Sequence, residues 1–178
     1  MRIRAAMVED AAGIARVHID SWRTTYAGIV PDAYLAGLSY EAREARWEER
    51  LGDLPVDDCV YIAVDEAGQI AGFAGGGPQR TALPGYAGEL YAIYLLRVAQ
   101  GQGLGRQLTS RVAAHLLRQG MRSMAVWVLT ANPSRGFYEA LGGQLIGEQP
   151  IAIGGATLQE AAYGWSEVAP LLVPATLA

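Results

Sequence analysis

The most strand-like stretch of the chain is Glu89-Leu-Tyr-Ala-Ile-Tyr-Leu-Leu96, and a glycine-rich turn, Gln100-Gly-Gln-Gly-Leu-Gly-Arg106, follows it closely. The stretch is nearly all apolar, so we predict a central strand. After the turn, apolar residues recur every four positions, which predicts a helix from about Gly103 to Gln119 with one core-facing stripe. The residues of this stripe are Leu104, Leu108, Val112 and Leu116. Strand, turn and helix form the central unit of the predicted fold.

The segments on either side of this unit predict an α+β domain. β-prone runs bounded by turn signals predict further strands at residues 3–6, 59–64, 69–74, 123–129, 144–148 and 158–165. Periodicity and capping signals predict helices from about residue 10, from 31–32, at 41–51 and from 132–133. Three glycines at 75–77 indicate a bulge or the end of a strand. This order of elements is typical of a layered α+β domain with a mixed sheet.

Length and composition fit one domain. The chain has 178 residues, of which 51% are hydrophobic, and it shows no internal repeat and no interdomain linker. We expect a single domain over residues 1–168, followed by an apolar tail over residues 169–178 that two prolines interrupt. The tail is interpreted as a loose end or as a strap that packs on the domain.

Several residue types are rare, and their scarcity excludes classes of chemistry. All 14 basic residues are arginines, which excludes Schiff-base chemistry, pyridoxal phosphate attachment and the Walker A phosphate loop. Cys59 is the single cysteine and the two histidines are far apart in sequence, so we expect no disulfide and no metal site. The net charge of −4 argues against a nucleic-acid partner. No targeting segment or membrane-spanning run is visible, which favours a cytoplasmic protein that does not bind membranes.

The glycine-rich turn carries the first chemical signal. Glycines at alternate positions let the backbone approach a ligand closely, and unpaired N–H groups meet the positive end of the helix dipole there. Such a turn favours an anion such as pyrophosphate, to which Arg106 adds a positive charge. The spacing does not fit a Rossmann fingerprint, because Arg106 occupies its last glycine position. A glycine-rich turn without a ligand is the alternative interpretation.

A second signal follows the strand predicted at 123–129. Asn132 stands at the start of a predicted helix, and Phe137 and Tyr138 lie less than two turns further on. Taken singly, Asn132 is equally well explained as a helix cap, and the two aromatic residues as part of the core.

Together the two signals resemble the GCN5-related N-acetyltransferase (GNAT) superfamily. Gln100, Gly103 and Gly105 match its Q/R-x-x-G-x-G/A signature, and the run from Asn132 through Phe-Tyr to a glycine matches its downstream block. The resemblance is close over residues 89–143. It implies a three-layer α/β/α domain with a central mixed, mostly antiparallel sheet. The implied order is strand, two helices, three strands, helix, strand, helix and two strands. Arg97 and Arg135 stand where many members have Pro and Ala, so contacts near the adenosine end are expected to differ.

The resemblance implies that acetyl-CoA is the cosubstrate. Its pyrophosphate would bind the turn at 100–106, and its pantetheine arm would pair with the end of the strand at 89–96, where the next strand diverges. Asn132 would bind the pantetheine amide or order a water near it. The implied cofactor-binding residues are Ile93, Leu95, Arg97, Gln100, Gly101, Gln102, Gly103, Leu104, Gly105, Arg106, Asn132 and Tyr138.

The resemblance also implies direct acetyl transfer to a primary amine of a small molecule or peptide. Tyr138 matches the family tyrosine that donates a proton to the departing thiolate. Glu89 is the candidate general base, and a structural carboxylate paired with an arginine is its alternative role. Trp22, Tyr26 and Tyr91 are expected to line the acceptor pocket, where aromatic rings can hold an amine by cation–π contact. Packing in the core is the alternative for Trp22 and Tyr26.

Two other functions stay open at this level. A sensor or interaction module that binds acyl-CoA without turnover would keep the same cleft. A nucleotide-binding regulatory domain would bind ATP or NAD more tightly than CoA. The sequence names no acceptor amine, and because many relatives are dimers, a homodimer is one expected state.

Overall fold

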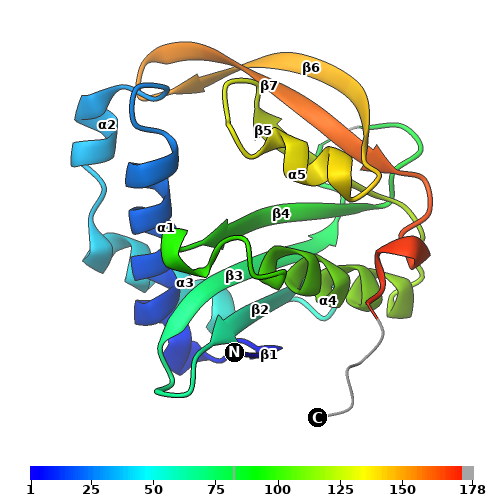
Figure 1. The fold of residues 1–178 in the computed structure, drawn as a ribbon, viewed down its shortest axis with the longest axis horizontal. Coiled ribbons are helices and arrows are strands. Elements are labelled where there is room, and N and C mark those ends of the chain that lie inside the picture. Colours follow the sequence, from blue (N-terminus) through cyan, green and yellow to red (C-terminus); the bar gives the residue numbers. More distant parts are fainter. Residues whose placement is uncertain (82, 174–178) are drawn as a thin grey trace.

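One seven-stranded sheet organises the computed structural model, which describes residues 1–81 and 83–173 (Figure 1). The strands are β1 (Arg2–Ala5), β2 (Cys59–Val64), β3 (Ile70–Pro78), β4 (Gly88–Leu95), β5 (Met124–Leu129), β6 (Gln144–Ile153) and β7 (Ala156–Trp165). The helices are α1 (Ala11–Thr25), α2 (Asp32–Ala36), α3 (Tyr40–Gly52), α4 (Leu104–Arg118) and α5 (Arg135–Ala140). Single 3-10 turns occur at Val8–Asp10, Arg97–Ala99 and Ala169–Leu171.

The strand order is β1-β2-β3-β4-β5-β7-β6, and every neighbouring pair except β4–β5 is antiparallel. Two apolar clusters fill the faces of the sheet. The cluster under α4 and α5 includes Leu108 and Tyr138, and the cluster under α1 and α3 includes Ile14 and Trp47. Helices therefore cover both faces (Figure 1). The α+β class, the three layers and the central place of β4 are confirmed.

Three of the predicted strands are longer in the structure. The strand predicted at 69–74 continues through the three glycines and ends at Pro78. The last two strands are also longer than predicted, and only Gly154 and Gly155 separate them. Both glycines have positive φ (58° and 81°), which lets them close a tight two-residue hairpin turn.

The helix after β5 begins later than predicted. Its first residue is Arg135 and its N-cap is Ser134, not Asn132. The Ser134 backbone N donates a hydrogen bond to Asn132 Oδ1 (2.8 Å), so the Asn132 side chain stabilises the turn that leads into the helix. The resemblance implies two helices between the first two strands. The structure has three α-helices there, because α2 forms a separate short helix.

A β-bulge lies in the middle of β4. The register steps from Leu90–Gly76 to Ala92–Gly75, so Tyr91 has no partner of its own on β3. β3 approaches β4 closely at Gly76, because a Cβ on Gly76 would lie 2.7 Å from a backbone oxygen of β4. A bulge bends its strand and increases its twist. It is therefore the local cause of a change in the direction of β4.

The end of the described chain packs on α4. Val168 and Leu171 belong to the cluster under α4, and Val173 N donates a hydrogen bond to Ser110 Oγ (2.8 Å). The boundary between domain and tail at residue 168 stays a prediction, and residues 174–178 of that tail lie outside the described residues. No helix within residues 1–81 and 83–173 has the length and hydropathy needed to cross a bilayer.

Candidate active site

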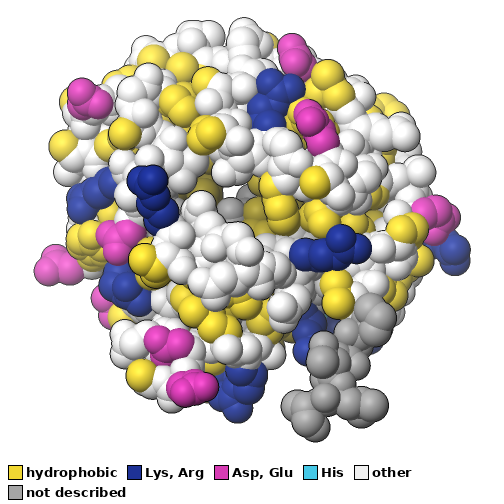
Figure 2. Space-filling view, viewed as in Figure 1, with side chains coloured by type: hydrophobic (Ala, Val, Ile, Leu, Met, Phe, Trp, Pro, Cys, Tyr) yellow, Lys and Arg dark blue, Asp and Glu magenta, His cyan; other side chains and the backbone are white. Residues whose placement is uncertain are grey.

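Strands β4 and β5 separate in the middle of the sheet. Among the described residues they pair only at Gly88–Met124 and Glu89–Ala125, and beyond these rungs they diverge. A cavity of about 460 Å³ lies in the gap, lined by both strands, α5 and the start of α4. Figure 2 shows the molecule hollowed at this place, near the centre of the face in view. The central unit of the fold therefore opens onto a cleft.

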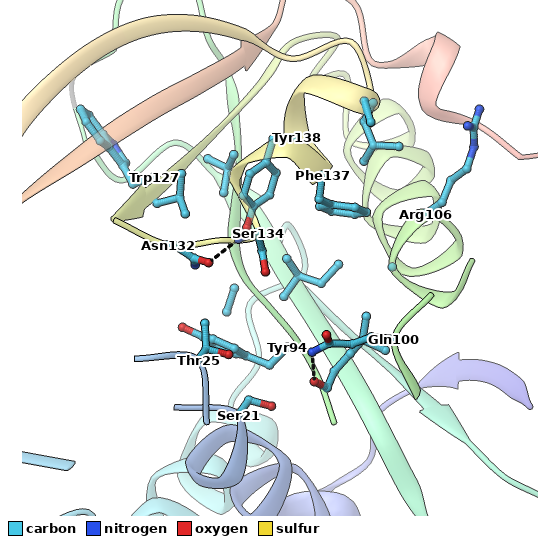
Figure 3. A pocket seen from close by; sticks show the side chains of 18 of the residues that line it. Ser21, Thr25, Tyr94, Gln100, Arg106, Trp127, Asn132, Ser134, Phe137 and Tyr138 are labelled. Atoms are coloured by element: carbon cyan, nitrogen blue, oxygen red, sulfur yellow. Dashed lines mark hydrogen bonds between the residues drawn. The ribbon is translucent and has the colours of Figure 1, made fainter. Parts of the chain in front are cut away.

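One edge of β4 faces this cavity with its backbone. Leu96 N donates to Ala71 O on the β3 side (2.9 Å), and backbone groups alternate between the two edges of a strand. The amide and carbonyl groups of Ile93 and Leu95 consequently face the gap. Gln100 Nε2 donates to Leu95 O (3.1 Å; Figure 3), which ties the glycine-rich turn to this edge.

The glycine-rich turn places the N-terminus of α4 at the mouth of the cavity. Gly101 and Gly103 have positive φ (73° and 76°), and Gly103 is the N-cap of α4. The first-turn amides of α4 have no partner within the helix, so they can bind an anion. Gly105 lets α4 approach α5, because a Cβ there would lie 3.0 Å from the Phe137 ring.

Arg106 is the single charged side chain among the described residues that line this cavity. Figure 3 shows its guanidinium extended away from the middle of the cavity, along the outer side of α4. Its position suits an anionic group at the rim, not one beside the gap between the strands.

Tyr138 projects from α5 into the cavity. It is 7% exposed, and Figure 3 shows its hydroxyl directed into the opening between the strands. Burial raises the pKa of this phenol above its usual value, so it carries its proton at neutral pH. Tyr138 can thus donate a proton to a group that becomes negative in the cavity.

The opposite end of the cavity is formed by hydroxyl groups from α1 and β4. Ser21, Thr25, Tyr26 and Tyr94 line it, and Asn132 Nδ2 donates to Tyr26 Oη (3.3 Å). Burial raises the pKa of both tyrosines, so both are neutral hydrogen-bonding groups near pH 7. Ser21, Thr25 and Tyr94 lie across the opening from Tyr138 (Figure 3).

The structure places the sequence-predicted residues unevenly. The cavity wall includes the cofactor candidates Ile93, Leu95, Gln100, Gly101, Gly103, Gly105, Arg106, Asn132 and Tyr138, and the acceptor candidates Tyr26 and Tyr91. It does not include Arg97, Gln102, Leu104, Trp22 or Glu89. The residue roles themselves stay predictions.

The candidates outside the wall have other surroundings. Arg97 begins a 3-10 turn, and Gln102 Nε2 donates to Val98 O (2.9 Å) within the same loop. Leu104 is 4% exposed in the core. Trp22 packs edge-on against Tyr26 at a centroid distance of 4.8 Å.

Glu89 and Tyr91 are both engaged by Arg80. Glu89 is 2% exposed, and it accepts hydrogen bonds from the Arg80 backbone N (3.0 Å) and from its guanidinium (2.5 Å). The same guanidinium lies 3.9 Å from the centroid of the Tyr91 ring. One face of Tyr91 is therefore already covered by a cation.

Sequence reasoning missed several residues of the cavity. The sequence pattern assigns Tyr94 only to the apolar central strand, and Ser21 and Thr25 only to the region of the first helix. A two-residue alternation cannot assign faces across the bulge at Tyr91, because the extra residue shifts the pattern by one position. The tyrosines of the central strand were the sequence signal that could have indicated Tyr94 as a cavity residue.

His18 stacks on Tyr94 behind the cavity, and its charge state predicts a pH effect on stability. The ring centroids are 5.0 Å apart. Burial and repulsion by Arg43 lower its pKa from 6.5 to about 3. Below pH 6.5 the unfolded chain binds a proton that the folded chain excludes, so the free energy of unfolding falls as the pH drops toward 4.

Between pH 8 and pH 5, we expect the free energy of unfolding to fall by roughly 1–2 kcal/mol less in His18→Phe than in the unmodified protein. Urea denaturation of both proteins at a series of pH values measures it. The control is the interval from pH 7.5 to 8.5, where the difference between the two proteins should be constant. A constant difference down to pH 5 would contradict the buried neutral imidazole.

Comparison with known proteins identifies the family. The family described as FR47-like protein matches residues 80–151. A protein of Bacillus subtilis (strain 168), named an uncharacterized N-acetyltransferase, YuaI, is 44% identical over 169 residues, which is 95% of each chain. The chain belongs to the GNAT superfamily.

Solved structures share the fold of this GNAT chain. The PaiA N-acetyltransferase of Thermoplasma acidophilum, solved in complex with coenzyme A, matches with a TM-score of 0.66 and 21% identity, over 89% of this chain and 96% of that one. The ribosomal-protein-alanine N-acetyltransferase of Brucella melitensis matches with a TM-score of 0.70 and 22% identity, over 93% and 99%. At these identities the likeness concerns the fold.

Proposed function

We propose that this GNAT chain transfers the acetyl group of acetyl-CoA directly to a primary amine of a small molecule or peptide. The observation that carries the proposal is the divergence of β4 and β5 directly after Glu89–Ala125. The resulting cavity joins an open backbone edge to the N-terminus of α4. A helix N-terminus binds a diphosphate, and an open strand edge binds a chain of amides, so the residues present fit CoA.

Acetyl-CoA supplies an activated thioester to this arrangement. The backbone groups of Ile93 and Leu95 hold the amide arm, and an N–H of this edge polarises the thioester carbonyl as a preorganised donor. The turn at Gly101–Gly105 binds the diphosphate. Tyr138, which keeps its proton at neutral pH, donates it to the departing sulfur.

The acceptor amine must lose a proton before it attacks. No Asp or Glu of residues 1–81 and 83–173 lines the cavity. We propose Glu89 as the base, acting through water, because it stands on the last rung before the strands separate. Its ion pair with Arg80 supports the alternative, a positioning role.

A pair of variants separates these two roles of Glu89. Glu89→Gln removes the basic carboxylate. Arg80→Gln breaks the same ion pair but leaves the Glu89 carboxylate in place. We expect kcat to fall at least tenfold in Glu89→Gln and much less in Arg80→Gln, measured as thiol release at saturating acetyl-CoA. Equal losses of kcat in the two variants would indicate that Glu89 acts by positioning Arg80 and not as the base.

The function itself is tested by CoA binding and turnover. We expect calorimetry to show CoA binding that ATP and NAD do not displace, and thiol release from acetyl-CoA to depend on an added amine. CoA binding without turnover on a broad amine panel would favour a sensor. Failure to bind CoA would overturn the proposal.

We further propose that the protein acts in the cytoplasm and forms a homodimer. Cys59 as a free thiol supports a reducing compartment. The ten-residue strand β6 is an edge of the sheet, and Leu145 on it is 54% exposed, which supports pairing of copies along that edge. Light scattering on the purified protein measures the oligomeric state, and a monomeric mass would contradict the dimer.

A further inference from the structure

A second cavity, of about 390 Å³, opens on the α3 side of β4. The proposed function assigns no role to any residue of α3. Its wall includes Trp47 and four arginines: Arg43, Arg46, Arg50 and Arg80. Guanidinium groups bind carboxylates and phosphates through paired, charge-assisted hydrogen bonds. A cavity with four of them is suited to an anion.

The spacing of α3 places three of these arginines on one helix face. Arg43, Arg46 and Arg50 follow one another at i, i+3 and i+7, and Trp47 among them is 8% exposed. Three glutamates fall on the opposite face: Glu41, Glu44 and Glu48. This face of the helix borders the second cavity, where Arg43 and Arg50 are partly buried and Arg46 is exposed. The sequence of this segment predicts a charged helix, and the segregation of its charges becomes visible only against the sheet.

The carboxylates nearby balance only half of the positive charge. Arg50 pairs with Asp58 (3.0 Å), and Arg80 pairs with Glu89 (2.5 Å). The other two arginines form no ion pair within residues 1–81 and 83–173. Arg50 Nε is also buried without a hydrogen-bond partner. Two positive charges and one buried donor are therefore available to a ligand.

The second cavity meets the first at the β4 bulge. Tyr91 and Ala92 line both cavities. Tyr91 is held in place, because its hydroxyl donates to Pro78 O (2.8 Å) and Arg80 covers one face of its ring. The arginine cavity and the gap between β4 and β5 therefore adjoin at Tyr91 and Ala92.

We infer that the acceptor is a small primary amine that also carries an anionic group, a carboxylate or a phosphate, bound by the arginines of α3. The inference rests on the proposed acetyl transfer and names its substrate class. In this arrangement the anionic group lies in the second cavity, and the amine extends past Tyr91 and Ala92 into the gap between β4 and β5. A neutral or cationic amine of the same length offers no counter-charge to Arg43 and Arg46.

Matched acceptor pairs test this inference. β-Alanine and 4-aminobutyrate are compared with their carboxamides, and 2-aminoethyl phosphate is compared with ethanolamine. We expect kcat/KM to be at least tenfold higher for the anionic member of a pair. The carboxylate and phosphate arms show which anion the cavity takes. Equal kcat/KM within every pair would overturn the inference while leaving acetyl transfer intact.

Variants of α3 locate the effect. In the double variant Arg43→Gln/Arg46→Gln, the ratio of kcat/KM for anionic over neutral acceptors should fall at least tenfold, with an unchanged Kd for CoA. Arg111→Gln on α4, an exposed residue far from α3 in sequence, is the matched control and should keep the ratio. Equal ratios in the double variant and the control would overturn the assignment to α3.

A binding measurement makes the test independent of turnover. Calorimetry of the CoA-saturated protein with 2-aminoethyl phosphate and with ethanolamine should show tighter binding of the phosphate. If neither molecule binds more tightly than the other, the arginine cavity is no acceptor site. A protein that binds the phosphate but turns over no amine would instead contradict the proposed function.

Discussion

Tyr138→Phe should lower kcat about a hundredfold while the affinity for CoA stays within twofold. The substitution keeps the ring that packs on Phe137 at a centroid distance of 5.3 Å and removes only the hydroxyl that faces the cavity. General acid catalysis contributes about 10²–10⁴-fold, and loss of a proton donor for the thiolate acts on the transition state alone. We therefore expect kcat and kcat/KM to fall together. Thiol release and calorimetry with CoA measure the two quantities.

A matched control for this result is Tyr61→Phe. The Tyr61 hydroxyl on β2 accepts a bond from Arg118 (3.3 Å) and does not line the cavity. The control substitution removes the same atom at a distant place, so its kcat should match that of the unmodified protein. Unchanged turnover in Tyr138→Phe would remove Tyr138 from the proton transfer and leave the departing sulfur to solvent.

Gly103→Val should raise the Kd for CoA about tenfold to a hundredfold. Gly103 has φ of 76°, and a β-branched residue in this conformation costs of order 1–3 kcal/mol. The loop relieves this strain by turning its amides away from the diphosphate, and each lost charge-assisted hydrogen bond costs about 1.5–3 kcal/mol. Calorimetry with CoA measures the change.

The other end of α4 offers a control with the same backbone strain. Gly120 has φ of 80°, and a Cβ added to either glycine would meet no atom within 4 Å. Gly103→Val and Gly120→Val should therefore lose similar free energy of unfolding, whereas only the former weakens CoA binding. Equal Kd values in both variants would mean that the turn does not bind the diphosphate.

Local patterns were enough to predict the part of the site that is continuous in sequence. Gly103 and Gly105 stand at the start of α4, and the Gln100 side chain donates to Leu95 O only five residues away in the chain. Asn132 and Tyr138 lie within two turns of each other after a buried strand. Because these features depend on neighbours in the chain, sequence spacing was sufficient to bring them together.

Features that depend on facing elements were not predictable in this way. The bulge at Tyr91 arises where the glycines of β3 let a strand approach closely, and it exchanges the faces of the residues that follow. Glu89 is expected at the head of the central strand, but its partner Arg80 comes from the loop after β3. Neither the change of faces after the bulge nor the pairing of Glu89 with Arg80 produces a periodic pattern in the sequence.

The sequence alone determined the central strand–turn–helix unit, because glycine spacing and apolar periodicity act over a few residues, and the resemblance of its two motifs to the GNAT superfamily indicated the family and the cosubstrate. The tertiary structure decided where the strands separate, which tyrosines face the gap and that the arginines of α3 meet Arg80 in one cavity. These outcomes depend on how a bulged strand bends and which helix face packs against it, and both are properties of contacts between distant segments.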